Sequence, residues 1–231
     1  MSLEGITNTA RAMTYQVRRQ EVTANNLANA NSDAFKADRL FARALAGEAF
    51  PVAVQQTDLQ QGTFRETGRP LDLALSGNGF LMIATEAGER LTRGGSFQID
   101  PQGRLVDGHG DAVLGIGGPI HVEGGTLEVQ GDGSVLVDGA VAGRLRVVEM
   151  SDLAQLQKEG LGRYVSRAPL IAADDTRTHV RQGAVEESNV DPLLTMVDMI
   201  TIQRAYAANV DALKAMDAVL GSITNEVGRV H

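Results

Sequence analysis

The sequence contains no cysteine and no tryptophan, and aromatic residues make up only 4% of its 231 residues. The absence of cysteine excludes a disulfide scaffold, a thiol nucleophile and a thiolate metal site. It leaves the compartment open, because a chain without cysteine is compatible with either redox environment. The shortage of aromatic side chains argues against a ligand-binding or carbohydrate-binding module, which needs aromatic and convergent polar groups in a concave site.

Charge and hydropathy remove further classes. The formal net charge is -8, so the chain lacks the basic face that nucleic-acid binders usually carry. No apolar run approaches the roughly 20 residues that a membrane span requires. The N-terminus also lacks the basic-then-apolar pattern of a cleaved secretory signal. We therefore expect no nucleic-acid partner, no membrane insertion and no cleaved signal peptide.

Patterns that would indicate catalysis or cofactor binding are weak. The four histidines are scattered without a short ligand spacing, and no Gly-x-Ser-x-Gly elbow is present. The segment Asp107 to Asp111 does not continue as a calcium-binding loop, and Gly115 to Pro119 lacks the third glycine of a dinucleotide fingerprint. Both segments are interpreted as turns. The sequence therefore predicts no metal, no cofactor and no enzyme.

Adjacent carboxylates occur at Glu186 and Glu187 and at Asp174 and Asp175. In an extended segment, neighbouring side chains point to opposite faces, so neither pair would converge on one substrate atom. We interpret both pairs as parts of solvated loops.

Two long helices are predicted at the ends of the chain. Near the N-terminus an apolar seam with spacings of three and four is interrupted only by Gln20, and it consists of Leu3, Ile6, Ala10, Met13, Val17, Gln20, Ala24 and Leu27. A second seam begins at Met199 and ends at Val230, and Asp191 and Pro192 precede it as N-cap and first helical residue. Such narrow seams gain stability from a partner, so the helices are expected to pack on each other or on neighbouring chains.

Glycine separates the middle of the chain from its ends, since all but three of the 26 glycines lie between residues 47 and 183. Short segments of strand-like composition, such as Gly79 to Ile83 and Ser134 to Val137, alternate there with Asp-Gly and Asn-Gly turns. The sequence predicts an α+β fold in which two long terminal helices pack as a coiled-coil-like arm beside a central, mostly antiparallel β domain. The expected parts are a helical arm at 1–37, an extended linker at 38–61, the β domain at 62–185 and a second helical arm at 186–231.

Three ordered motifs resemble one family across nearly the whole chain. Val22 to Asn29, followed by Ala34-Phe35-Lys36, is similar to the N-terminal signature of the bacterial flagellar basal-body rod, hook and hook-associated proteins. Gly68 to Phe80 and Leu91 to Phe97 resemble the central β motif of that family. Glu186 to Val190 and Met196 to Tyr206 resemble its C-terminal motif.

The resemblance implies a structural role. Members of this family are exported unfolded by the flagellar type III export apparatus without signal cleavage, and they assemble into the axial structure of the flagellum. A single β domain in 231 residues resembles a subunit of the proximal or the distal rod. The short stretch from about Asp38 to Gln61 before the β motif favours the proximal rod, with the distal rod as the alternative. The expected partners are other proximal and distal rod subunits and the export apparatus. The expected place is the basal-body rod, which crosses the periplasm and transmits torque.

Assembly contacts are predicted on the two seams and on the asparagines of the motifs. The asparagines at the end of the first helix have amides that can satisfy free helix carbonyls or bond a neighbouring subunit. Some seam residues could instead form intramolecular core. The predicted interface comprises Leu3, Ile6, Met13, Val17, Asn25, Asn26, Leu27, Asn29, Asn189, Ile202, Tyr206, Leu213, Met216, Leu220 and Ile223.

Overall fold

The computed structural model describes residues 3–43 and 52–227. These residues form two compact units. The arm unit contains the described residues of Met1–Ala30, Asp38–Asp58 and Val190–His231, and the β unit contains Asn31–Ala37 and Leu59–Asn189. A helical part and a separate antiparallel β part confirm the predicted α+β class.

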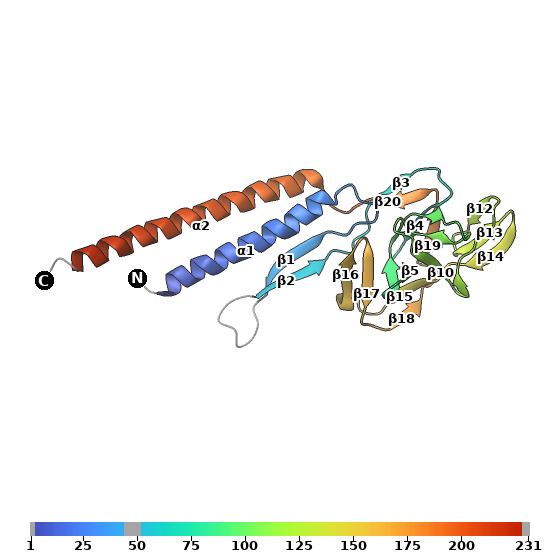
Figure 1. The fold of residues 1–231 in the computed structure, drawn as a ribbon, viewed down its shortest axis with the longest axis horizontal. Coiled ribbons are helices and arrows are strands. Elements are labelled where there is room, and N and C mark those ends of the chain that lie inside the picture. The colour runs from blue at the N-terminus through green and yellow to red at the C-terminus, as the bar shows by residue number, and fades with distance from the viewer. Residues whose placement is uncertain (1–2, 44–51, 228–231) are drawn as a thin grey trace. The chain divides into compact units, whose positions relative to one another are not determined.

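The arm unit contains two long helices and one hairpin. Helix α1 (Leu3–Ala28) and helix α2 (Pro192–Val227) contact each other and are antiparallel (Figure 1). Strand β1 (Asp38–Arg43) pairs antiparallel with strand β2 (Val52–Thr57), and β1 also contacts α1. The stretch 38–61, expected as an extended linker, therefore contains a paired hairpin. None of the described helices is long and apolar enough to span a membrane.

The start of α2 follows from a side-chain cap. The carboxylate of Asp191 accepts hydrogen bonds from the backbone N–H groups of Leu193 at 2.9 Å and Leu194 at 3.0 Å. These N–H groups have no carbonyl partner within the helix, which is why aspartate is favoured at this position. Pro192 follows as the first helical residue, where its missing N–H costs nothing. The predicted start of the helix is confirmed.

The β unit consists of short strands, and every pairing among the described strands is antiparallel. Its elements are β3 (Phe64–Glu66), β4 (Asp72–Ser76), β5 (Phe80–Thr85), β6 (Gly88–Thr92), β7 (Gly94–Ser96), β8 (Gln98–Ile99), β9 (Leu105–Val106), β10 (Ala112–Gly115), β11 (Gly118–Pro119), β12 (Leu127–Val129), β13 (Ser134–Val137), β14 (Ala140–Arg144), β15 (Val147–Met150), the 3-10 turn Leu153–Gln155, β16 (Leu156–Gly160), β17 (Arg163–Ser166), β18 (Leu170–Ala172), β19 (His179–Gln182) and β20 (Ala184–Glu186).

Strand β5 lies at the centre of the β unit, because it pairs with β6, β10 and β15. Its side chains alternate between two hydrophobic clusters. Leu81 and Ile83 join one cluster, whereas Phe80 and Met82 join the other. Alternation along one strand therefore divides the core into two layers, as the two-residue period of a strand requires.

Strand β4 holds a buried carboxylate at its first residue. Burial alone would raise the pKa of Asp72, but hydrogen bonds donated by Arg69, Thr67 and Ser96 outweigh burial and hold that pKa below its usual value. Folding therefore weakens proton binding at Asp72. Its contribution to stability is fully present above the unfolded pKa of about 4 and is lost as the pH falls through the folded pKa.

The substitution Asp72→Asn tests this coupling, since the amide cannot lose a proton. We expect the variant to be less stable than the parent at pH 7 and the difference to shrink as the pH falls below about 4. Urea denaturation of both proteins over this pH range measures it. A stability difference that is independent of pH would contradict the assignment.

Candidate functional site

The first turns of α2 present apolar side chains to solvent. Leu193 is 71% exposed, Val197 is 53% exposed and Ile200 is 50% exposed, and their spacing of four and three places them on one face of the helix. Leu194 and Met196 extend the same surface. We call these five residues the α2 outer face. Single exposed apolar residues are common, but a contiguous patch of this kind marks a surface that another molecule covers.

The predicted seam of α2 lies on the opposite side of the helix. Ile202 is only 1% exposed, and Tyr206, Leu213 and Met216 are half-buried. Since α1 and α2 contact each other, these residues contribute to packing within one arm unit. Sequence periodicity found this stripe but did not indicate the α2 outer face, because both faces of the first turns are apolar.

Helix α1 buries a more polar stripe than expected. Met13 and Leu27 are half-buried, whereas Val17 is 41% exposed. Half-buried positions recur every three or four residues at Thr9, Met13, Gln16, Gln20, Thr23 and Leu27. The side chains of Leu3, Ile6, Leu220 and Ile223 lie outside the described residues.

The asparagines at the end of α1 bond within the chain. Asn26 accepts from the backbone N–H of Asp38 at 2.9 Å and donates to its carbonyl at 2.8 Å, so one amide pins the start of β1 to the helix. The side chain of Asn29 donates to the carbonyl of Asn25 at 2.9 Å, and the same carbonyl also accepts from the backbone N–H of Asn29 at 3.2 Å. Asn25 itself is exposed.

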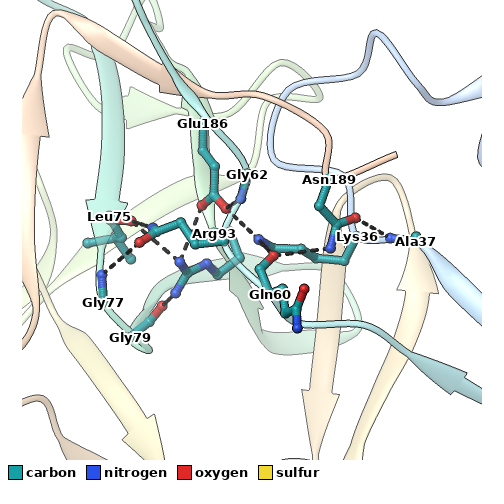
Figure 2. Close-up of polar contacts among 11 residues, drawn as sticks. Lys36, Ala37, Gln60, Gly62, Leu75, Gly77, Gly79, Arg93, Glu186 and Asn189 are labelled. Carbon is teal, nitrogen blue, oxygen red and sulfur yellow. Dashed lines mark hydrogen bonds and ion pairs between the residues drawn. The ribbon is translucent and has the colours of Figure 1, made fainter. Parts of the chain in front are cut away.

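Three charged side chains meet inside the β unit. Lys36, Arg93 and Glu186 come from distant parts of the sequence, and we call them the ion node. Both Lys36 and Glu186 are fully buried, and Arg93 is 3% exposed. Figure 2 shows the Glu186 carboxylate between the two cations, ion-paired with Lys36 through one oxygen and with Arg93 at 3.3 Å through the other.

Backbone groups complete the coordination of the ion node. The N–H of Gly62 donates to Glu186 at 2.9 Å, and the ammonium of Lys36 donates to the carbonyl of Gln60 at 2.7 Å. Arg93 donates to the carbonyl of Gly79 and stacks its guanidinium over the ring of Phe80. Each buried charge is therefore paired and makes hydrogen bonds, as charges in a protein interior require, although the Nε of Arg93 is buried without a hydrogen-bond partner among the described residues.

Asn189 binds the same segments beside the ion node. Its side-chain oxygen accepts from the N–H of Ala37 at 2.7 Å, and its amide donates to the carbonyl of Gln60 at 3.1 Å (Figure 2). Of the predicted interface residues, Asn189 is therefore the one that the structure places next to the buried charges. Its amide joins three chain segments within the β unit.

The backbone at the ion node is tightly constrained. A Cβ atom at Gly62 would lie 2.0 Å from the carbonyl oxygen of Glu187, so only glycine fits there. Ala34 adopts a φ of 55°, a left-handed conformation that costs a non-glycine residue about 1 to 2 kcal/mol. Its N–H donates to the carbonyl of Glu186 at 2.6 Å. The surrounding contacts hold this turn in place.

Glu186 corrects the interpretation of the Glu186–Glu187 pair as a solvated loop. Glu186 ends strand β20 with its side chain in the interior, whereas Glu187 is exposed and pairs with Arg65 at 3.2 Å. The expected opposite orientation of the two carboxylates is correct, but only one of them is solvated. The cations that stabilise Glu186 are 150 and 93 positions away, so local sequence could not reveal them.

The three sequence motifs converge at the ion node. Lys36 belongs to the first motif, Arg93 to the second, and Glu186 and Asn189 to the third. Within the described residues, no group of His, Asp or Glu side chains is arranged to hold a metal ion. The ion node holds distant chain segments together, and the first turns of α2 carry an exposed apolar face. Both features are typical of a structural protein that assembles with other subunits.

Comparison with known families supports this class. Residues 6–36 match the family model described as "Flagella basal body rod protein", and residues 74–137 match the "Flagellar hook protein FlgE/F/G D1 domain". Residues 181–226 match the "Flagellar basal body rod FlgEFG protein C-terminal".

Full-length relatives agree. The flagellar basal-body rod protein FlgF of Caulobacter vibrioides is 32% identical and the match covers 96% of each chain. FlgF of Escherichia coli K12 is 33% identical over 89% of this chain and 91% of the relative. FlgG of Bacillus subtilis is 28% identical over 89% of this chain and 92% of the relative.

The chain belongs to the flagellar basal-body rod protein family, and it is therefore a structural protein of the flagellar basal body and not an enzyme. Within this family it is FlgF-like, with FlgG proteins as near relatives.

Adjacent glutamates allow a matched test of the ion node. Glu186→Gln leaves two buried cations without an anion, so we expect it to lower the free energy of unfolding by about 3 to 5 kcal/mol. Glu187→Gln removes only an exposed ion pair and should cost less than about 1 kcal/mol. Urea denaturation at pH 7 compares the two variants. Equal effects would show that the buried carboxylate has no special role in stability.

Proposed function

We propose that this chain is the FlgF-type subunit of the proximal rod and that it assembles through the exposed surfaces of its terminal helices. The α2 outer face is the observation that supports this proposal. Its five apolar side chains are exposed in the isolated chain, and burying each would contribute about 1.5 to 3 kcal/mol. A rod subunit surrounded by others would cover this surface.

The geometry of one chain favours open assembly. The α2 outer face is apolar, whereas the exposed surface of α1 includes the charged side chains of Arg11, Arg18 and Glu21. A patch that fits a different patch on the next copy makes a heterologous contact, and such contacts build helical filaments when they do not close into rings. The rod in this proposal is a tube of that kind, whose shaft crosses the periplasm and transmits torque.

The arm in this proposal behaves as a coiled-coil-like element that neighbouring copies complete. Within one chain, α1 and α2 supply only two helices, and the stripe between them leaves Val17 and the α2 outer face uncovered. We propose that Val17 and the α2 outer face make contacts between subunits. The half-buried residues of the predicted interface, such as Leu27, Tyr206 and Leu213, then serve mainly to pair α1 with α2.

The route to the rod is also part of the proposal. We infer export in an unfolded state through the flagellar type III apparatus without removal of a signal peptide, as the family resemblance implies. The other partners in this proposal are the neighbouring subunits of the proximal and distal rod.

The substitution Ile200→Asp tests the assembly surface. Ile200 is half exposed, so a charge there should leave the chain folded while placing an unpaired carboxylate in the proposed contact. We expect an unchanged midpoint of thermal unfolding and loss of the chain from isolated basal bodies. Gln102→Asp, which introduces the same residue at an exposed turn of the β unit, outside the helices, is the control and should assemble normally. Normal incorporation of the Ile200→Asp chain would contradict the assignment.

A deletion strain tests the place of the chain in the rod. We expect electron microscopy of isolated basal bodies to show a short rod without distal rod or hook, and mass spectrometry to find the chain in wild-type basal bodies. A deletion strain whose rod keeps the full length of the proximal rod, instead of stopping short within it, would favour a FlgG-like position. Complete flagella in the deletion strain would contradict a role in the rod.

A further inference from the structure

The ion node involves segments that lead to the points where the chain passes from one unit to the other. The chain passes between the arm unit and the β unit four times, after Ala30, Ala37, Asp58 and Asn189. Any force that the arm unit passes to the β unit through the covalent chain must enter through these four crossings. The segments that carry them are far apart in sequence, so only tertiary contacts can make them act together.

The contacts around the ion node bind the ends of these segments to each other. At the second crossing, Ala37 donates to Asn189, which is the last residue before the fourth crossing. Near the third crossing, the carbonyl of Gln60 accepts from both Lys36 and Asn189. All of these contacts lie inside the β unit (Figure 2).

The first crossing leads into the same cluster. Ala34, which follows it by a few residues, donates to the carbonyl of Glu186. A further element supports this segment from strand β16, because the ammonium of Lys158 lies 3.6 Å from the centre of the Phe35 ring and donates to the carbonyl of Lys36 at 2.7 Å. The four crossings therefore share one set of hydrogen bonds and ion pairs.

Stability alone gives no reason for charged groups at this position. Replacing a buried ion pair by apolar residues of similar volume is often neutral or stabilising, because desolvation offsets most of the electrostatic attraction. Apolar contacts are non-directional, however, and allow surfaces to slide. Hydrogen bonds weaken steeply when their angle or distance changes, so they resist relative movement of the segments that they join.

We infer that the ion node is a mechanical joint, which makes the four crossing segments act as one rigid body and so passes torque between the arm unit and the β unit. This inference rests on the proposed function, in which the chain is part of a rotating shaft. In this role Lys36, Glu186 and Asn189 are positioning residues, and Arg93 anchors Glu186 to the body of the β unit through Gly79.

An apolar replacement separates stiffness from stability. The variant Lys36→Met removes the ammonium that joins Glu186 to Gln60 and keeps a similar side-chain volume, while Glu186 stays paired with Arg93 and the carbonyl of Gln60 still accepts from Asn189. We expect the midpoint of thermal unfolding to stay near that of the parent. Glu187→Gln is the matched control, since it alters the exposed neighbour of Glu186.

Hydrogen exchange of the purified full-length chain measures the rigidity of the joint. The amides of Ala37, Glu187 and Asn189 keep their acceptors in the Lys36→Met variant, so a change in their exchange reports opening of the segments. We expect their protection to fall by roughly 10- to 100-fold, the equivalent of one lost charge-assisted hydrogen bond. The amides of Leu105 and Leu145, which bond within the β core, should keep the protection of the parent.

Rotation under load tests the same variants in the flagellum. We expect cells with the Lys36→Met variant to form complete basal bodies and to rotate normally at low load, but to lose rotation at high load, as measured with beads of increasing size on the filament. Cells with Glu187→Gln should behave as wild type throughout.

The outcomes distinguish the joint from the rod assignment. Parental protection at Ala37 and Asn189, or wild-type rotation of the Lys36→Met variant at high load, would overturn the joint while leaving the rod subunit in place. If the variant does not assemble, the exchange measurement alone decides. Absence of the wild-type chain from basal bodies would instead overturn the rod assignment, and the role of the joint with it.

Discussion

The burial of Glu186 between two cations is the interaction on which the organisation of this chain depends. A buried charge needs a partner of opposite charge, so the carboxylate depends on its cations, and Lys36 and Arg93 both depend on the one carboxylate. Because they come from the start, the middle and the end of the sequence, their pairing fixes the path of the backbone where the chain repeatedly leaves the β unit.

The two units differ in how far they bury their apolar side chains. The β unit has its own core of two hydrophobic clusters divided by strand β5. The arm unit consists of two long helices and a hairpin, and the described residues leave the apolar side chains of the α2 outer face exposed. A β unit with its own core and a helical arm with an exposed apolar face suit a subunit whose arm is covered by neighbouring subunits. The ion node, inside the β unit, holds the segments that lead to this arm.

Sequence patterns predicted where helices and strands form better than they predicted which side chains are buried. The seam from Met199 onward and the Asp191 cap located α2, and glycine distribution located the β domain, because these signals depend on local geometry. The same reasoning treated Glu186 as solvated and placed the assembly contacts on residues such as Ile202, which is buried within one chain. Burial depends on what lies across from a residue, and a periodic pattern does not name that partner.

By itself the sequence determined the helices, the turns, the antiparallel β class and the family, since each is encoded in residues that are neighbours in the chain or in motifs of fixed order. Only the tertiary structure decided that Lys36, Arg93, Glu186 and Asn189 meet, and which face of α2 is left exposed. The physical reason is that ion pairs and packing act through space. Their energy depends on distances between residues that the chain brings together only when it folds.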